Sequence, residues 1–227
     1  MRIDIVTLFP RMFEGVLSES MLRLAQEKNI LRTSLVNPRD FTTDRHKSVD
    51  DRPYGGGPGM VWKCKPVVEA VRHVQAQEPE APGRVLLMCP RGRIFDQAYA
   101  RELSLEQRLI LIAPHYEGYD ERVVEILKAE RLSIGNFVLT GGELPALMVI
   151  DAVTRLLPGV LGDDTSAHVE SFSPGNAGLL EYPQYTRPVE FEGLRVPDIL
   201  MSGDHAEIEA WRREQAERVT RERAERR

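Results

Sequence analysis

Short apolar runs alternate along the chain with stretches whose apolar residues recur every three or four positions. The run RIDIVTLF near the N-terminus alternates like a β-strand. After Pro10, residues 11–28 carry Met12, Phe13 and Val16 at helical spacing, and the following LRTSLV is strand-like again. This order predicts a β-α-β unit at the start of the chain.

The same alternation continues through the middle of the chain. Apolar runs at 84–89 and 108–113 predict further strands, and helices are predicted from Asp96 and from Asp120, the second capped by the Asp120 carboxylate. Another helix is predicted over Glu143–Leu157. Strands separated by helices in this way predict an α/β fold with a mostly parallel sheet that is covered on both faces.

The periodicity is lost from Pro158 to about Pro188, where Gly, Pro, Ser, Asp and Asn accumulate. A stretch of this length without periodicity predicts a linker or a mobile loop, because long irregular loops are usually functional or disordered. Near the C-terminus, Asp204 is suited to cap a last helix, with Glu207 completing a capping box. The predicted organisation is a main domain over 1–160, a linker over 161–188 and a C-terminal helical domain over 189–227.

Composition narrows the class of protein. The 227 residues are 42% hydrophobic, which is enough for a proper core, and the two cysteines, Cys64 and Cys89, lack metal-site spacing. No apolar run suits a signal sequence or a membrane helix, so a cytoplasmic protein without membrane contact is expected. A net charge of −5 argues weakly against a general nucleic-acid binder.

The C-terminal tail, WRREQAERVTRERAERR, is nevertheless basic, with seven arginines against four glutamates. A solvated helix with Glu/Arg pairs explains this composition, and so does contact with phosphates. The tail alone does not decide between the two.

Three loops follow predicted strands at their carboxyl ends, in the sequences CPRGRIFDQ, APHYEGYDERV and IGNFVLTGGELPA. Ligands bind at those ends in an open parallel sheet, and glycine lets a ligand approach the main chain. The chain has neither GxGxxG after its first strand nor a P-loop GKS or GKT, which argues against a dinucleotide or P-loop site. A pocket for a small ligand, such as an adenosine held by backbone amides, is expected.

A second glycine cluster, DRHKSVDDRPYGGGPGM at residues 44–60, places charges of both signs beside Tyr54 and Gly55–Gly59. A flexible surface loop explains it, and a nucleotide partner also fits, because Lys47 and Arg52 can bind phosphates while Asp50 accepts from base edges. No second histidine lies within ligand spacing of His46, so no metal site is assigned.

Several of these motifs together resemble a known enzyme family. LFP, PRDFTTDRHKSVDDRPYGGGPGM, YEGYDERV, SIGNFVLTGGELPA, PGVLG, YTRP and LMSGDHAEIEAWRR are similar, in this order, to the bacterial tRNA (guanine-N1)-methyltransferases, the TrmD family. The resemblance runs from residue 1 to about 220. A lone GG motif would carry little weight, whereas this ordered set is specific.

The resemblance implies a SPOUT fold, in which the glycine-rich loops tie a deep trefoil knot that holds S-adenosylmethionine in a bent form. It implies methylation of tRNA at N1 of guanosine-37, the guanosine 3′ of the anticodon, by a homodimer with active sites at the interface. By match, Glu170 is the catalytic base and Arg155 stabilises negative charge on the guanine O6. From the pattern alone, Glu170 could not have been chosen over Asp163 or Asp164.

The resemblance also implies which residues bind the cofactor. They are Leu87, Met88, Cys89, Pro90, Pro114, Tyr116, Glu117, Ser133, Ile134, Gly135, Asn136, Phe137, Val138, Leu139, Gly141, Gly142 and Pro145. Magnesium is linked to the activity of the family, and the sequence offers no ligand cluster for it, so only weak or substrate-borne binding is expected.

The chain departs from the family pattern at several positions. Glu170 stands where many members have aspartate, Pro114 cannot donate an amide, His115 replaces an arginine, and the C-terminal end is shorter than expected. Three alternatives remain open at this point. Another SPOUT methyltransferase would lack this motif set, a nonenzymatic RNA binder would not need three bare loops at one sheet edge, and an α/β oxidoreductase would need a nucleotide fingerprint.

Overall fold

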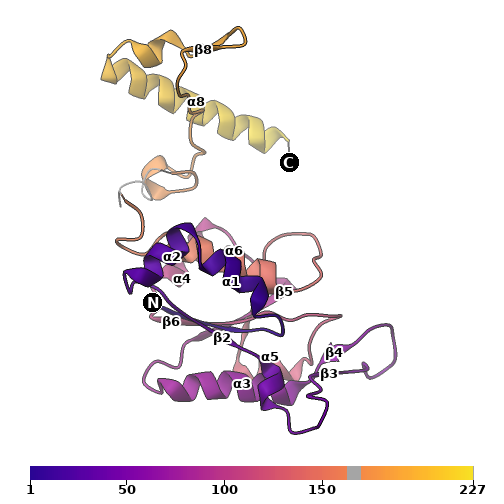
Figure 1. Cartoon of the computed structure of the whole chain (residues 1–227). Helices are drawn as coiled ribbons and strands as arrows, with labels where there is room; N and C mark the ends of the chain where they lie inside the picture. Colours follow the sequence, from indigo (N-terminus) through magenta and orange to yellow (C-terminus); the bar gives the residue numbers. More distant parts are fainter. Residues whose placement is uncertain (163–169, 227) are drawn as a thin grey trace. The chain divides into compact units, whose positions relative to one another are not determined.

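The computed structural model describes residues 1–162 and 170–226, and the chain divides into two compact units, Met1–Gly162 and Asp163–Arg227. Five strands of the first unit form a parallel sheet in the order β2-β1-β6-β5-β7 (Figure 1). They are β1 Arg2–Val6, β2 Arg32–Val36, β5 Arg84–Ile94, β6 Arg108–Ile112 and β7 Glu130–Ser133. The predicted α/β class with a mostly parallel sheet is confirmed.

Helices cover both faces of this sheet (Figure 1). One face carries α1 Arg11–Leu17, α2 Ser20–Glu27, α4 Gln97–Ser104 and α6 Glu143–Thr154, and the other carries α3 Cys64–Gln77 and α5 Arg122–Leu127. Side chains of a strand point alternately to the two faces. In β6, Leu109 and Leu111 therefore join the core under α6, whereas Ile110 and Ile112 join the core under α3.

The single helix predicted over residues 11–28 is wrong, because the chain forms two helices there. α1 ends at Leu17, Ser18 is its C-cap, and the extended Glu19 precedes α2. The Ser18 hydroxyl donates to the Gly15 carbonyl at 3.2 Å. Serine competes for backbone hydrogen bonds in this way, which favours a helix end over a helix interior.

Other predicted boundaries shift by a few residues. β5 does not stop at Cys89 but continues to Ile94, with an irregularity in its pairing to β7. α6 ends at Thr154 rather than at Leu157. Asp96 caps α4 by accepting from the Tyr99 amide at 2.7 Å, and Asp120 accepts from the Arg122 amide at 3.0 Å.

The second glycine cluster is a short hairpin rather than a plain loop. β3 Asp50–Asp51 pairs antiparallel with β4 Val61–Trp62, and η1 Pro38–Phe41 precedes it. Between the two strands, Gly55, Gly56 and Gly57 have positive φ, a backbone conformation that favours glycine. The hairpin therefore holds the exposed Tyr54 on a stretch of backbone that depends on glycine.

The second unit is built on the helix α8, His205–Glu225. The remaining elements are η2 Pro174–Asn176, the β8 Glu190–Phe191 and β9 Leu194–Arg195 hairpin, and η3 Asp198–Met201. Asp204 caps α8 through the Ala206 and Glu207 amides. The predicted capping box is incomplete, because the Asp204 amide donates to the Ser202 hydroxyl at 3.1 Å instead of to Glu207.

Part of the segment predicted as a linker is folded within this unit. The Phe172 amide donates to Leu179 at 2.9 Å, and the Leu180 amide donates to the Thr220 hydroxyl at 2.9 Å. The Arg223 guanidinium lies 5.0 Å from the centre of the Phe172 ring. The described part of the segment thus packs against α8, while Asp163 and Asp164 lie outside the described residues.

A buried charge cluster ties the sheet to α3. The fully buried Asp4 accepts from Arg2 at 2.8 and 3.0 Å and from Arg108 at 2.8 Å. Arg108 also donates to the Val74 carbonyl at 2.6 Å, on α3. The two guanidinium groups compensate the burial of the carboxylate, which would otherwise be costly.

We expect Asp4→Asn to lower the free energy of unfolding by about 3 kcal/mol, because an amide leaves the buried Arg108 without an anionic partner and leaves Arg2 with Glu78 alone. Denaturant unfolding monitored by circular dichroism measures this change. Arg32→Ala is the control, since the Arg32 side chain is 74% exposed. The control should stay within about 0.5 kcal/mol of wild type. Equal effects of the two substitutions would contradict a stabilising role of the Asp4 cluster.

Candidate active site

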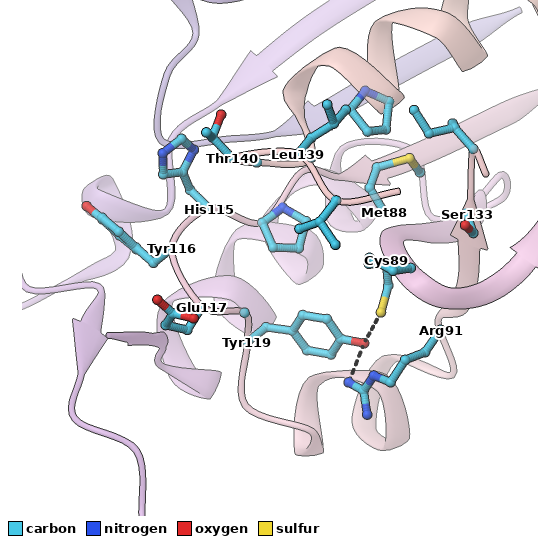
Figure 2. Close-up of a pocket in the computed structure, with 18 of the residues that line it drawn as sticks. Met88, Cys89, Arg91, His115, Tyr116, Glu117, Tyr119, Ser133, Leu139 and Thr140 are labelled. Carbon is cyan, nitrogen blue, oxygen red and sulfur yellow. Dashed lines mark hydrogen bonds between the residues drawn. The ribbon is translucent and has the colours of Figure 1, made fainter. Parts of the chain in front are cut away.

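A pocket of about 350 Å³ lies at the carboxyl edge of the sheet (Figure 2). The irregular second half of β5 and the loops after β6 and β7 contribute to its wall, as expected for ligand sites of parallel sheets. Its lining residues are Val61, Met88, Cys89, Pro90, Arg91, Pro114, His115, Tyr116, Glu117, Gly118, Tyr119, Leu132, Ser133, Ile134, Gly135, Phe137, Val138, Leu139, Thr140, Gly141, Gly142 and Pro145.

The structure brings together all of the residues proposed to bind the cofactor except Leu87 and Asn136. Leu87 is fully buried and belongs to the core under α3, because the alternation along β5 turns its side chain away from the pocket edge. Asn136 lies in the same loop as the lining residues but is not among them.

Sequence reasoning missed several lining residues. Four of them lie within loops that the sequence had already singled out, namely His115, Gly118, Tyr119 and Thr140. Their position in those loops could have identified them as lining residues. Arg91 and Leu132 are likewise neighbours of predicted residues. Val61 comes from the β4 strand, and no sequence pattern connected that strand with the pocket.

One end of the pocket is polar (Figure 2). The Tyr119 hydroxyl donates to the Cys89 sulfur at 3.4 Å and accepts from Arg91 at 3.2 Å and from Arg131 at 3.0 Å. Arg91 also pairs with Glu121 at 2.9 Å. Burial of the thiol opposes its ionisation, but the hydrogen bonds from Tyr119 and Arg91 outweigh burial and lower the pKa of Cys89.

Tyr119 is affected in the opposite direction. Burial and the hydrogen bond to Cys89 raise the pKa of the Tyr119 hydroxyl, so this group stays protonated at neutral pH and acts as a donor. The polar end therefore combines a donor, two guanidinium groups and an ionisable thiol in a pocket whose remaining wall is largely apolar.

Glycines allow the pocket loops to pass close to one another. A Cβ on Gly92 would overlap the backbone of Arg131 and Leu132, and the Phe95 amide donates to the Ser133 carbonyl at 2.7 Å. A Cβ on Gly142 would lie 2.9 Å from the Ala113 Cα. Backbone contact at these two positions requires glycine, because any side chain would push the loops apart.

Gly141 is restricted by side chains rather than by backbone. A Cβ there would overlap Glu143 Oε2 and lie 2.5 Å from His115 Nδ1. The sequence had suggested that the ligand or a passing chain explains this glycine. In the structure, a carboxylate and an imidazole occupy the space above it.

Neither of the two predicted catalytic residues belongs to the pocket loops. Arg155 is the C-cap of α6, as its position at the helix end predicted. Glu170 belongs to the second unit, where its carbonyl accepts from the Ser173 amide at 3.0 Å. The structure thus does not bring either residue into the set that lines the pocket.

Within residues 1–162 and 170–226, no group of three or more His, Cys, Asp and Glu side chains is arranged to hold a metal ion. No helix in the described part of the chain is long and apolar enough to span a membrane.

Comparison with known proteins decides the family. The family described as tRNA (Guanine-1)-methyltransferase TrmD matches residues 1–226. This chain belongs to the TrmD family. The family resemblance inferred from the motifs, and with it the prediction of a tRNA (guanine-N1)-methyltransferase enzyme, is confirmed.

Individual TrmD relatives match over nearly their whole length. The tRNA (guanine-N(1)-)-methyltransferase of Pelotomaculum thermopropionicum is 55% identical over 216 residues, which cover 95% of this chain and 85% of the relative. That of Geobacter metallireducens is 56% identical over 216 residues, covering 95% and 86%. That of Geobacillus kaustophilus is 54% identical over 220 residues, covering 97% and 88%.

The pocket generates a prediction about its thiol. Because Arg91 and Tyr119 lower the pKa of Cys89 while burial raises that of Cys64, the Cys89 thiolate forms at lower pH. Alkylation by iodoacetamide should therefore rise at lower pH for Cys89 than for Cys64, as peptide mass spectrometry across a pH series can show.

Arg91→Ala is the matched test of the cause. Loss of this cation should move the Cys89 alkylation profile to higher pH and leave the Cys64 profile in place. A Cys89 profile that does not move in the variant would contradict stabilisation of the thiolate by Arg91.

Proposed function

We propose that this chain methylates N1 of guanosine-37 in tRNA, the guanosine 3′ of the anticodon, with S-adenosylmethionine as the methyl donor. The observation that carries the proposal is the match of residues 1–226 to the TrmD family, together with a pocket built from the loops that hold the family motifs. Methyl transfer to tRNA transcripts with and without guanosine at this position tests it directly.

The pocket suits this cofactor in size and chemistry. Its volume of about 350 Å³ lies within the range of small-molecule sites, and its wall is mostly apolar with a few polar groups. When bound, S-adenosylmethionine supplies an activated methyl group on its sulfonium. Met88, Ile134, Leu139 and Pro145 supply apolar surface, and the bare backbone around Gly141 allows close approach.

Two side chains act on the guanine base, whose N1 is the nucleophile. Guanine N1 carries a proton, so a base must remove it as the methyl group arrives. The Glu170 carboxylate takes this proton, and the Arg155 guanidinium stabilises the negative charge that develops on O6. A glutamate at 170 in place of aspartate keeps the carboxylate and adds one methylene of reach.

The position of Arg155 supports a site shared between two subunits. α6 begins at the pocket and has 12 residues, so its C-cap lies about 18 Å farther along the helix axis. An arginine side chain is too short to span that distance within one subunit. In a homodimer, the pocket of one subunit and Arg155 of the other complete one site.

Exposed apolar side chains support the same assembly. α1 and α6 lie on one face of the sheet, and Met12, Val16, Leu144 and Met148 on these helices are each exposed by 43–52%. Helices of a monomer normally bury such side chains against another element. A second copy of the chain covers them.

The close backbone passages support the trefoil knot of the SPOUT fold. Gly92 passes against Arg131 and Leu132, and the Gly142 amide donates to the Pro114 carbonyl at 2.6 Å. A knotted chain threads one loop through another, so its crossing points need residues without side chains. The cofactor pocket is enclosed by the same crossings.

The second unit provides tRNA contacts. α8 contains three Arg–Glu pairs spaced three or four residues apart, which are Arg212–Glu209, Arg213–Glu217 and Arg218–Glu222. Further arginines of the helix bind phosphates. The proposed functional division is a methyltransferase domain over 1–160, a segment over 161–188 that carries Glu170 and whose described part packs against α8, and a tRNA-binding domain over 189–227.

Magnesium has no defined place in this proposal. The described residues offer no cluster of carboxylate, histidine and cysteine side chains for it. We therefore assign no step to the metal.

Replacing the base gives a direct prediction. Glu170→Gln keeps the shape of the side chain but cannot accept the N1 proton, so the single-turnover rate of methyl transfer should fall roughly 10²- to 10⁴-fold. Calorimetry should give unchanged affinity for S-adenosylmethionine. The control is Glu80→Gln, the same change at an exposed carboxylate, which should leave both quantities unchanged.

A Glu170→Gln rate within twofold of wild type would remove Glu170 from the mechanism. A rate loss that shrinks as pH rises would support base-catalysed deprotonation, because hydroxide then replaces the missing base.

Mixed dimers test the shared site. Gly141→Val should abolish cofactor binding, because its side chain overlaps Glu143 and His115. In a mixed dimer of the Gly141→Val and Glu170→Gln variants, one shared site has both parts intact. Its Gly141 comes from the Glu170→Gln subunit, and its Glu170 comes from the Gly141→Val subunit. Refolding the two inactive variants together should therefore restore activity, to at most half of the wild-type level per mixed dimer.

Native mass spectrometry confirms that the subunits have exchanged. Exchanged mixtures that stay inactive would exclude the shared site, and the methyltransferase assignment would stand.

A further inference from the structure

A buried carboxylate next to the pocket has no part in the mechanism above. Glu143 is the first residue of α6 and its exposed fraction is 1%. Oε1 accepts from the Thr7 hydroxyl at 3.5 Å, and Oε2 lies 3.3 Å from His115 Nδ1. Within the described residues, His115 is its only partner that can carry positive charge at this distance.

The hydrogen bonds around Glu143 assign the proton on His115. The Thr7 hydroxyl accepts from the Phe9 amide at 3.0 Å, so its own proton is free to donate to Glu143. A buried carboxylate is an acceptor, and therefore His115 Nδ1 carries a proton and donates to Oε2. The carboxylate fixes the orientation of the imidazole, as carboxylates do for histidines in many sites.

The pair lies at the point where two loops of the pocket meet. His115 belongs to the loop after β6, and Glu143 follows directly on the loop that ends at Gly142. His115 and Gly141 form an isolated antiparallel bridge, and the space above Gly141 is filled by the imidazole and the carboxylate. Both loops supply lining residues, among them Tyr116 and Leu139.

Two neighbouring aromatic rings also hold the His115 side chain in place. Its ring centre lies 4.6 Å from that of Phe9 and 5.3 Å from that of Tyr116. The side chain is 23% exposed and belongs to the pocket wall. A change in the orientation of His115 therefore moves both Tyr116 and the Gly141 backbone.

The position of Glu143 at the start of α6 also favours its carboxylate. A carboxylate in the first turn of a helix is stabilised by the helix dipole and its free amides. The main consequence of breaking the pair is therefore the release of the loop that carries His115, and not the unfolding of α6.

We propose that Glu143 and His115 form a positioning pair that locks the two loops in the shape that binds the cofactor. The inference rests on the proposed function, because it concerns the S-adenosylmethionine pocket. Neither residue contacts the reacting atoms in this role. The pair determines cofactor affinity and leaves the chemical step itself unaffected.

His115→Phe tests the pair, because phenylalanine keeps the ring contacts with Phe9 and Tyr116 but cannot donate to Glu143. We expect the Kd for S-adenosylmethionine to rise about tenfold or more, as calorimetry measures. At saturating cofactor, kcat for tRNA methylation should stay within about twofold of wild type. His115→Asn, whose amide can donate to Glu143, should recover part of the lost affinity.

The matched control is His73→Phe. His73 is an exposed histidine on α3 with its own aromatic neighbour, Phe41, at 5.2 Å between ring centres. This substitution makes the same chemical change away from the pocket, so the Kd for S-adenosylmethionine should equal that of wild type.

A double-mutant cycle with Glu143→Gln isolates the contact. If the two residues act as a pair, His115→Phe should raise the Kd much less in the Glu143→Gln background than in wild type. Thermal unfolding of each variant identifies general destabilisation.

The outcomes separate the two proposals. A wild-type protein that does not bind S-adenosylmethionine contradicts the proposed function itself. Wild-type binding together with normal affinity in His115→Phe, or equal losses of affinity in both backgrounds, overturns only the positioning pair. Lower kcat at unchanged Kd would also overturn it, because His115 would then act on the reaction rather than on binding.

Discussion

The pocket exists because two backbone segments come together without side chains between them. At Gly92 an added Cβ would meet the main chain of β7, and at Gly142 it would meet that of the loop after β6; the hydrogen bonds beside these positions are short and direct. Widening either passage would separate the second half of β5 from β7, or the loop after β6 from the loop after β7. These segments form most of the pocket wall, so its shape depends on contact between backbones.

Two buried carboxylates serve this architecture in different ways. Asp4 lies within the sheet and is held by two arginines that cannot lose their charge, which joins β1 and β6 to α3 permanently. Glu143 lies at the carboxyl edge and is held by a histidine and a hydroxyl. The stronger pairing is found in the scaffold, and the weaker and more adaptable pairing is found beside the pocket.

The groups proposed to act on guanine do not belong to the pocket loops. Arg155 is at the far end of α6, and Glu170 follows the end of the first unit. An enzyme that holds its cofactor in one structural unit and its base in another can leave the site incomplete until the tRNA and a second subunit are in place.

The sequence by itself determined the fold class, the family and most of the pocket wall. Alternating apolar runs define parallel strands and helices through local physics, and ligand loops follow the strand ends, so the loops that contain Tyr116 and Gly141 could be singled out in advance. The individual cofactor-binding residues, such as Cys89, came from the family resemblance. The hydrophobic periodicity misled at Ser18, where a helix end was predicted as a helix interior.

Only the tertiary structure decided which residues meet across loops. Val61 enters the wall from a hairpin, Leu87 faces the other side of the sheet, and Glu143 lies over Gly141 beside His115. Some of these contacts join residues that are far apart in the chain. Others depend on which face of the sheet a strand residue points to. A one-dimensional pattern records neither the distance between two loops nor the space above a glycine, and both follow only once the whole sheet is folded.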